Sequence, residues 1–461
     1  MYTIDFSHPS SLYFVGIGGI SMSGMALLLQ DAGFQVCGSD RAPSATTEML
    51  EAQGVTVFYG QRAENMTEAG RIDCVVFTAA IHPDNPEYKE AHARLLPCLT
   101  RGQLLGQIMK HYQTPIAVSG THGKTTATSM VGEILLGAGL DPTLSIGGVL
   151  KDIGGNMRIG HSGYFVAEAC EYTNSFLDFF PKVGIILNIG EDHLDFFKDL
   201  EDIRHSFRRF AGLLPQDGCL IINGNIERLE EITEGLRCRV VTFGAGEPND
   251  YFATDIRYDG FGNPRFILHC PGGAKRPVTL SVPGEHNVYN ALAALALADC
   301  LGIDGSLAAG ALQGYKGTDR RFEHKGTIGG VTVIDDYAHH PTEIEATLKA
   351  AANYPHRKLW CVFQPHTYTR TKAYLKEFAR SLCLADEVVL ADIYAARETD
   401  TLGVHSQDLQ REIQALGHVC HYFPSFDEIE NFLLENCIKD DLLITMGAGD
   451  VVKIGESLLG S

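Results

Sequence analysis

The residues best suited to chemistry stand together between an apolar run, 116–119, and a helical pattern. Glycines there allow backbone N–H groups to turn inward, and the helix N-terminus favours an anion. Lys124 can meet the outer phosphates of a nucleotide, and the Thr125 hydroxyl can reach Mg2+. Val118 stands where a generic P-loop has glycine, so the loop is a shortened one, and an ordinary glycine turn is the alternative. The stretch is Gly120-Thr121-His122-Gly123-Lys124-Thr125-Thr126.

Two further polar clusters follow the next strands that the sequence predicts. Glu168 comes directly after the run 164–167, and a segment with His193 follows the run 183–188. In open parallel sheets, ligands bind beyond the carboxyl ends of the strands, so we expect these clusters to converge on the phosphate loop. Together they would form an ATP–Mg2+ site. Taken alone, His193 fits a capping or core histidine at least as well.

A second glycine-rich turn, 16–21, follows the first predicted strand and contains Gly18 and Gly19. Asp40 ends the second strand, near the spacing of an acid that binds a nucleotide ribose. Ser21 replaces the third glycine of a dinucleotide-binding fingerprint. The pattern therefore leaves open NAD, another phosphate-bearing ligand, or a purely structural turn.

Short apolar or β-branched runs alternate with helical patterns, which predicts successive α/β units with parallel sheets. The first unit runs from 12 to about 110, the second begins near 111 and the third near 318. Turn signals within 251–283 predict antiparallel hairpins between the last two. The predicted strands are Leu12–Val15, Phe34–Gly38, Val55–Phe58, Cys74–Thr78, Ile116–Ser119, Tyr164–Ala167, Val183–Asn188, Leu220–Ile222, Val240–Phe243, Val331–Asp335, Leu359–Phe363, Glu387–Ala391, His418–Phe423 and Leu442–Thr445.

An Ala/Leu-rich helix, expected to be buried, follows the hairpins and runs to about residue 301. Asn287 and Asn290 near its start could cap it or contact a base. In the third unit, polar residues again follow the strand ends. The adjacent His339 and His340 lack the spacing of a zinc site.

Arg320 and Arg321 lie at the start of the third unit. They could neutralise charge that develops on a transferred phosphoryl group. A solvated hinge between domains is the alternative.

The composition is that of a globular protein, with 45% hydrophobic residues in 461. A net charge of -20 argues against a nucleic-acid or polybasic membrane partner, and requires that an anionic substrate be held by local positive groups. The twelve cysteines form no C-x-x-C pair, and no export signal or membrane-spanning run is visible. We expect a soluble protein of the cytoplasm with reduced thiols.

Motifs along the whole chain resemble those of the Mur ligases, which build the peptidoglycan precursor peptide. The phosphate loop matches their ATP loop. Within the family, the segments Gly16 to Ser23, Asp335 to Glu343 and Gln364 to Arg370 are most similar to those of the enzymes that add the first amino acid. The other matching segments are Gly16-Ile17-Gly18-Gly19-Ile20-Ser21-Met22-Ser23, Asn85-Pro86-Glu87, the Glu168 segment, Asp192-His193-Leu194-Asp195, Gly284-Glu285-His286-Asn287, Arg320-Arg321-Phe322-Glu323, Asp335 to Glu343 and Gln364 to Arg370.

The resemblance implies an α/β protein of three domains. A Rossmann-like domain, 1–110, would hold the UDP-sugar, and a Rossmann-like domain, 318–461, would bring the amino acid. Between them, 111–317 would be a P-loop ATPase-type domain with a parallel sheet and a small antiparallel part.

The resemblance also assigns roles to single residues. ATP would contact the loop Gly120 to Thr126, including Gly120, Thr121, His122, Gly123, Lys124, Thr125 and Thr126, with Asn287 and Asn290 near adenine, Asp336 near ribose and Arg321 near the γ-phosphate. Mg2+ would be held by Thr125, Glu168 and His193. The UDP-sugar would contact Gly18, Gly19, Ser21, Ser23, Asp40 and His122, and L-alanine would contact Tyr337, His339, His366 and Arg370.

The implied reaction is carboxylate activation. The carboxylate of UDP-N-acetylmuramate would take the γ-phosphoryl group of ATP, and the amine of L-alanine would displace phosphate. Lys124, Glu168, His193, Arg321 and His339 are the expected catalytic residues. The partners would be these small molecules, with no nucleic acid and no membrane span, and the enzyme would be a monomer or homodimer.

Two rival hypotheses remain. A nicotinamide-dependent dehydrogenase built on the turn 16–21 would leave the Lys124 loop without a task. The other rival is a close relative with another acceptor, such as the ligase that recycles a whole peptide onto the same sugar. A non-catalytic regulator is opposed by the retention of Lys124, Glu168 and His193.

Three segments depart from the family pattern. Many relatives have two more acids where this chain has Cys170 and Thr173. The stretch Ser206-Phe207-Arg208-Arg209 has no lysine at the place where some Mur ligases carry a carbamylated one, so we predict no carbamate. Thr367 stands where some relatives have arginine, which leaves Arg370 more of the carboxylate binding.

Lys124→Ala should abolish nucleotide-dependent turnover, because the outer phosphates lose their cation, while UDP-sugar binding to the first domain survives. Phosphate release and calorimetric titration with the UDP-sugar measure the two effects. Loss of both together would contradict the domain assignment.

Overall fold

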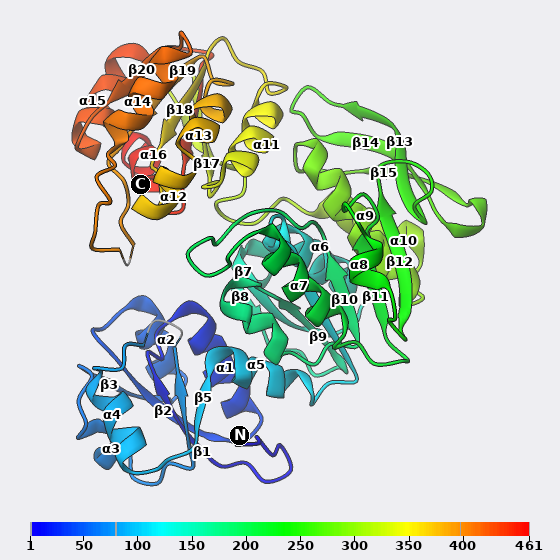
Figure 1. The fold of residues 1–461 in the computed structure, drawn as a ribbon, viewed down its shortest axis with the longest axis vertical. Coiled ribbons are helices and arrows are strands. Elements are labelled where there is room, and N and C mark those ends of the chain that lie inside the picture. The colour runs from blue at the N-terminus through cyan, green and yellow to red at the C-terminus, as the bar shows by residue number, and fades with distance from the viewer. Residues whose placement is uncertain (1, 79–80, 397, 461) are drawn as a thin grey trace. The chain divides into compact units, whose positions relative to one another are not determined.

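The computed structural model describes residues 2–78, 81–396 and 398–460 (Figure 1). The chain forms two compact units. The first comprises Met1–Ile189, Ile203–Ile222 and Ile226–Val241, and the second comprises Gly190–Asp202, Asn223–Asn225 and Thr242–Ser461. The predicted boundaries near 110 and 317 do not appear in this division and stay a prediction.

The first sheet, in unit 1, has five parallel strands in the order β3-β2-β1-β4-β5. Helices alternate with the strands, as the sequence predicts. β5 was not predicted, because three residues carry too little pattern. The elements, drawn in blue and cyan in Figure 1, are β1 (Ser11–Val15), α1 (Ile20–Asp31), β2 (Gln35–Asp40), α2 (Ala45–Ala52), β3 (Thr56–Tyr59), α3 (Asn65–Glu68), β4 (Cys74–Phe77), α4 (Pro86–Ala93), β5 (Cys98–Thr100) and α5 (Arg101–Met109).

The second sheet of unit 1 has parallel strands in the order β11-β10-β6-β9-β7, with β8 antiparallel at its edge. The predicted strands before and after the phosphate loop are confirmed. β7 and β8 were missed. The elements are β6 (Thr114–Ser119), α6 (Lys124–Gly137), β7 (Thr143–Leu150), β8 (Gly155–Arg158), β9 (Tyr164–Glu168), β10 (Val183–Ile186), α7 (Leu200–Ala211), β11 (Cys219–Asn223) and α8 (Glu230–Thr233).

Unit 2 begins its regular structure with a small antiparallel part. β13 (Tyr251–Tyr258), β14 (Pro264–His269) and β15 (Lys275–Thr279) form successive antiparallel pairs, which confirms the predicted hairpins. β13 also pairs with the end of β12 (Arg239–Gly244) in parallel. The helix α9 (Glu285–Cys300) buries nearly every residue from Val288 to Ala298, as expected from its Ala/Leu-rich sequence, and α10 (Gly305–Gly314) follows.

The third sheet has the order β16-β17-β21-β18-β19-β20, with the first pair antiparallel and the rest parallel. β16 was not predicted, because its residues are mostly polar and none of them is buried. The elements are β16 (Glu323–Ile328), β17 (Val331–Asp336), α11 (Pro341–Ala351), β18 (Leu359–Phe363), α12 (Tyr368–Ala373), α13 (Leu375–Leu382), β19 (Glu387–Leu390), α14 (Ser406–Ala415), β20 (Cys420–Tyr422), α15 (Phe426–Asn436), β21 (Leu442–Met446) and α16 (Val452–Leu459).

Successive residues of the central strands of this sheet enter two different hydrophobic cores. Ile334 and Ile444 lie in one core, while Val333 and Leu443 lie in the other. A parallel sheet covered by helices on both faces needs strands that are apolar throughout, which explains why these were predicted well.

None of the helices among the described residues combines the length and the apolar run that a bilayer crossing requires.

Leu382→Ala should lower the free energy of unfolding of the body around the third sheet by about 2–5 kcal/mol, because it leaves a cavity at a side chain with no exposed surface. The fluorescence of Trp360, the single tryptophan and a member of the adjoining core, follows this unfolding. Leu384→Ala is the matched control, since Leu384 is 44% exposed and its change should cost less than about 0.5 kcal/mol. Equal losses would contradict the packing described.

Candidate active site

The phosphate loop joins the end of β6 to the start of α6. Gly120 has φ 145° and Gly123 has φ 83°, both in the region that favours glycine. A Cβ atom on Gly120 would also lie 2.9 Å from Cβ of Leu187. The two glycines therefore let the backbone turn tightly between strand and helix, as the sequence predicts.

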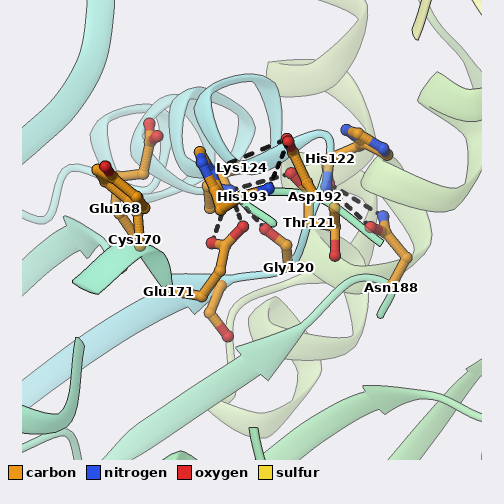
Figure 2. A network of polar contacts seen from close by, with 12 residues as sticks. Gly120, Thr121, His122, Lys124, Glu168, Cys170, Glu171, Asn188, Asp192 and His193 are labelled. Carbon is orange, nitrogen blue, oxygen red and sulfur yellow. Dashed lines mark hydrogen bonds and ion pairs between the residues drawn. The ribbon is translucent and has the colours of Figure 1, made fainter. Parts of the chain in front are cut away.

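The Lys124 side chain is held inside this loop, with only 12% of it exposed (Figure 2). Its Nζ donates to the carbonyl oxygens of Gly120 (2.6 Å) and Thr121 (3.0 Å) and to both carboxylate oxygens of Glu171 (2.9 and 3.2 Å). Burial alone would lower the pKa of Lys124, but the Glu171 carboxylate outweighs it and raises the pKa above its usual value. Lys124 is therefore a cation held ready at the loop.

Glu168 joins the end of β9 to the start of α6. Its Oε2 accepts hydrogen bonds from the Thr125 hydroxyl and from the Gly147 N–H, both at 2.9 Å. The sequence predicts Thr125 and Glu168 at one site, and the structure brings them into contact.

Asn188, after β10, fastens the other side of the loop. Its side-chain oxygen accepts from the N–H of His122 (2.8 Å), its Nδ2 donates to the carbonyl of His122 (2.9 Å), and its own carbonyl accepts from Thr121 (3.1 Å). The polar segments after β6, β9 and β10 thus meet within unit 1, as expected for the carboxyl edge of a parallel sheet. The backbone of His122 is fixed on both sides.

The described residues contain no group of three or more His, Cys, Asp and Glu side chains placed to hold a metal ion. The pair Thr125 and Glu168 nevertheless offers two oxygens beside a phosphate loop. Mg2+ bound to nucleotide phosphates takes one or two such protein ligands and keeps several waters, so these residues fit that ion.

His193 lies in unit 2, in a left-handed backbone conformation with φ 54°. Its N–H donates to Oδ1 of Asp192 at 2.7 Å, and its side chain is 22% exposed.

The position where relatives have an acid after Glu168 holds the thiol of Cys170. Burial raises the pKa of this thiol to about 11, so the group is neutral at physiological pH. Glu171, which the sequence analysis did not assign, supplies the carboxylate that Lys124 needs. Its place three residues beyond the end of the strand was the available signal.

The glycine turn of the first sheet is held from the end of β2. The carbonyl of Ser39 accepts from the N–H groups of Gly16 (2.8 Å) and Ile17 (2.9 Å), and Oδ2 of Asp40 accepts from Gly18 (2.8 Å). Gly16 has φ 79°. The observed contact of Asp40 is therefore with the turn itself.

Arg101, which the sequence analysis missed, reaches the same turn from the start of α5. Its Nη1 donates to the Ser21 hydroxyl at 3.0 Å. Among the described residues the structure pairs it with no carboxylate, so its charge is available to an anion at the turn. Its position directly after β5, at the carboxyl edge of the sheet, was the signal. Ser23 is buried and donates to the carbonyl of Ile20.

In unit 2, Arg370 makes a buried ion pair. Its Nη2 donates to Oδ1 of Asp192 at 2.9 Å, and Nη1 lies 3.2 Å from Nδ1 of His366. Burial opposes ionisation of Asp192, but the charge of Arg370 outweighs it and lowers the pKa of Asp192 well below its usual range. Arg370 thus already holds a carboxylate.

The two arginines at the start of the third sheet differ. Arg320 is engaged with Oδ2 of Asp335 (3.0 Å) and with the carbonyl of Gly447 (2.7 Å). Arg321 stands over the ring of Tyr337, 5.2 Å from its centroid, and the described part of the chain offers it no ion pair. Of the two, only Arg321 therefore keeps a charge that a ligand could use, and its role at the γ-phosphate stays a prediction.

Both carboxylate oxygens of Asp336 accept hydrogen bonds from backbone N–H groups, one from Phe322 and one from Ala338, at 2.8 Å each. Burial raises its pKa to about 6. The observed role is to fix the chain around β17, and the predicted ribose contact stays a prediction.

Other predicted residues of unit 2 lie near each other in two groups. The ring of His339 is 5.4 Å from that of Tyr337 and 5.6 Å from that of His366, and burial lowers the pKa of His339. Asn287 and Asn290 are buried: Asn287 donates to the carbonyl of Pro283, and Asn290 donates to Asn287. Both asparagines thus secure the start of α9.

Three family models match the chain in succession. They are described as Mur ligase family, catalytic domain (residues 11–113), Mur ligase middle domain (118–298) and Mur ligase, glutamate ligase domain (320–449).

Relatives match over the full length. A UDP-N-acetylmuramate–L-alanine ligase of Lachnospira eligens is 57% identical and one of Agathobacter rectalis is 56% identical, each with all of both chains covered. A solved UDP-N-acetylmuramate-alanine ligase from Thermotoga maritima superposes with a TM-score of 0.82 at 29% identity, covering 98% of each chain. A murein peptide ligase from Psychrobacter arcticus gives 0.72 at 26% identity, also covering 98% of each.

Sheets with a phosphate loop at one carboxyl edge and a glycine turn at another define an α/β nucleotide-dependent enzyme. The chain belongs to the Mur ligase family.

His366→Asn should make the free energy of unfolding of unit 2 depend less on pH in the acid range. Burial, with the neighbouring charges of His339 and Arg370, lowers the pKa of His366 to about 3. The unfolded chain therefore binds one proton more than the folded chain from about pH 6.5 down to about 4, which removes stability as pH falls, by about 1 kcal/mol per pH unit.

The asparagine oxygen can accept from Arg370 in place of Nδ1 but does not titrate. Denaturant midpoints followed by Trp360 fluorescence at a series of pH values test this. Parallel curves for the variant and the parent protein would contradict the assignment of a neutral, buried His366.

Proposed function

We propose that this protein is the ATP-dependent ligase that joins L-alanine to the carboxylate of UDP-N-acetylmuramate. The single observation that carries the proposal is the phosphate loop, in which Thr125 contacts Glu168 and Lys124 contacts Glu171, in a chain whose full-length relatives bear that name. This is the first peptide-forming step in peptidoglycan precursor synthesis.

The reaction has two steps. A carboxylate oxygen of the sugar attacks the γ-phosphorus of ATP, and ADP leaves, which gives an acyl phosphate. The amine of L-alanine then attacks the acyl carbon, and phosphate leaves from a tetrahedral intermediate together with the loss of the amine proton. The protein contributes mainly by positioning the reactants and neutralising charge.

Lys124 is the residue that we assign to the outer phosphates. In the structure its ammonium group lies within hydrogen-bonding distance of four oxygen atoms, two of them on the Glu171 carboxylate, and phosphate oxygens are equivalent acceptors. The backbone N–H groups of Gly123 to Thr126 lie at the N-terminus of α6, where they favour an anion. Arg321, whose charge is not paired with a carboxylate of the described residues, is assigned to the γ-phosphoryl group.

Mg2+ would be held by Thr125 and Glu168, with His193 as a further ligand. When bound, this ion neutralises phosphate charge and orients the nucleotide. Glu168 and Thr125 hold each other in place without it.

The UDP-sugar is assigned to the glycine turn of the first sheet, with Gly18, Gly19, Ser21, Ser23 and Asp40. We add Arg101, because a diphosphate in a protein of net charge -20 needs a local cation. His122, whose backbone is fixed by Asn188, would turn its ring toward the sugar.

L-alanine is assigned to Tyr337, His339, His366 and Arg370. The ion pair with Asp192 supports this assignment, because the Arg370 guanidinium there donates to a carboxylate at 2.9 Å. Asn287, Asn290 and Asp336 would border the adenosine. His339 is assigned to the catalytic set with Lys124, Glu168, His193 and Arg321.

Domain boundaries at 110/111 and 317/318 are part of the proposal, because each of the three sheets falls inside one of these ranges. We further propose a cytoplasmic location, where ATP is available, and a monomer or homodimer.

A phosphate-release assay with ATP, UDP-N-acetylmuramate and a panel of amino acids tests the function. L-alanine should give the largest kcat/KM, and omission of Mg2+ should abolish turnover. Turnover with a tripeptide but not with L-alanine would instead identify a peptide-recycling ligase, and NAD binding in place of UDP binding would indicate a dehydrogenase.

A further inference from the structure

Glu87, in the motif Asn85-Pro86-Glu87, is a carboxylate with no exposed surface. Its Oε1 accepts from the Tyr13 hydroxyl (2.9 Å) and from Nδ2 of Asn65 (2.8 Å), and its Oε2 accepts a short hydrogen bond from the Ser39 hydroxyl. None of the roles described so far uses this residue.

No Lys, Arg or His among the described residues pairs with Glu87. Burying an unpaired charge is costly, so its surroundings must offset the cost. Three neutral donors do so, together with the start of α4, where Asn85 caps the helix by accepting from the N–H groups of Glu87 and Tyr88. A buried carboxylate of this kind is expected to have a structural or functional role.

The hydrogen bond from Ser39 connects Glu87 to the glycine turn. Ser39 is the penultimate residue of β2, and its carbonyl holds the N–H groups of Gly16 and Ile17. The next residue, Asp40, holds the N–H of Gly18. Three successive N–H groups of the glycine turn therefore donate to two adjacent residues, Ser39 and Asp40. Of these two, Ser39 is hydrogen-bonded directly to Glu87.

Glu87 also ties this end of β2 to the neighbouring elements. Tyr13 belongs to β1, and Asn65 belongs to α3, where its Nδ2 also donates to the carbonyl of Gly60. The carboxylate is thus a common acceptor for donors from β1, β2 and α3. A rotation of the Ser39 backbone would break contacts on both sides of the residue.

We propose that Glu87 is a positioning residue for the UDP-sugar subsite: through Ser39 it sets the shape of the turn 16–19 that receives the diphosphate. The inference rests on the proposed function, which places the UDP-sugar at this turn. Because Glu87 itself has no exposed surface, it would act through Ser39 and not by contact with the substrate.

The test compares Glu87→Gln and Ser39→Ala with a matched control, Ser11→Ala. Ser11 lies at the opposite end of the same strand pair, where its hydroxyl donates to Gln35 at 2.8 Å. Each serine change removes one hydroxyl hydrogen bond, from Ser39 to Glu87 or from Ser11 to Gln35, but only Ser39 borders the turn. The measurements are the Kd for UDP by calorimetry, and kcat and the two KM values in the phosphate-release assay.

Glu87→Gln and Ser39→Ala should each raise the Kd for UDP and the KM for UDP-N-acetylmuramate by about 10-fold, the loss of one hydrogen bond to a charged group. The KM for ATP should change by less than about 2-fold. The double variant should have about the same Kd for UDP as the weaker-binding single variant, because both changes break the same hydrogen bond between Ser39 and Glu87. Ser11→Ala should lower the melting temperature with little change in any KM.

An unchanged Kd for UDP in Ser39→Ala and Glu87→Gln, with only a lower melting temperature, would overturn the inference, as would equal losses in both KM values and in kcat. If Glu87→Gln fails to fold, Ser39→Ala still tests the connection. Failure of the proposed function is distinguishable, because the unaltered protein would then bind no UDP at all.

Discussion

The buried ammonium group of Lys124 is the interaction on which the site depends. A lysine that is 12% exposed must replace its lost hydration with hydrogen bonds, and here two loop carbonyls and the Glu171 carboxylate do so. This requirement draws together segments from different strands. β6 supplies the loop, β9 supplies Glu168 and the segment with Glu171, and the residue after β10 that fastens the loop is Asn188. In the proposed function, a phosphate group bound at Lys124 would replace one set of oxygen acceptors with another, so the charge would stay paired.

The same principle appears at the other sheets. In the first sheet a buried carboxylate, Glu87, is balanced by neutral donors, and the residues it fixes hold the glycine turn. In unit 2, Arg370 is paired with Asp192 and Arg320 with Asp335, while Arg321 is left for a ligand. An acidic protein that binds several anions thus keeps two of its site cations, Lys124 and Arg370, paired and in place beforehand. Such preorganisation lowers the cost of ordering them during the reaction.

The strength of the sequence patterns explains what could be predicted. Strands buried on both faces, such as β18 and β21, are continuous apolar runs and were found almost to the residue, whereas β5 and β16 are short or polar and were missed. Lys124 and Thr125 stand in a recognisable loop after one strand, and Glu168 stands at the end of another. Glu171, Arg101 and Glu87 could not be assigned, because their importance lies in contacts with residues 47, 80 and 48 positions away in the chain. The carboxylate of Asp336 was expected to face a ribose, but its hydrogen bonds to the backbone are visible only once the chain is folded.

Transfer of an oxygen atom from the sugar carboxylate to phosphate tests the reaction most directly. UDP-N-acetylmuramate labelled with oxygen-18 in its carboxylate is incubated with ATP, Mg2+, L-alanine and the protein, and the released phosphate is analysed by mass spectrometry. Attack of the carboxylate on the γ-phosphorus predicts that each phosphate formed carries one labelled oxygen. Unlabelled phosphate formed together with the alanyl product would contradict an acyl phosphate, and with it the role of the Lys124 loop in presenting ATP to a carboxylate.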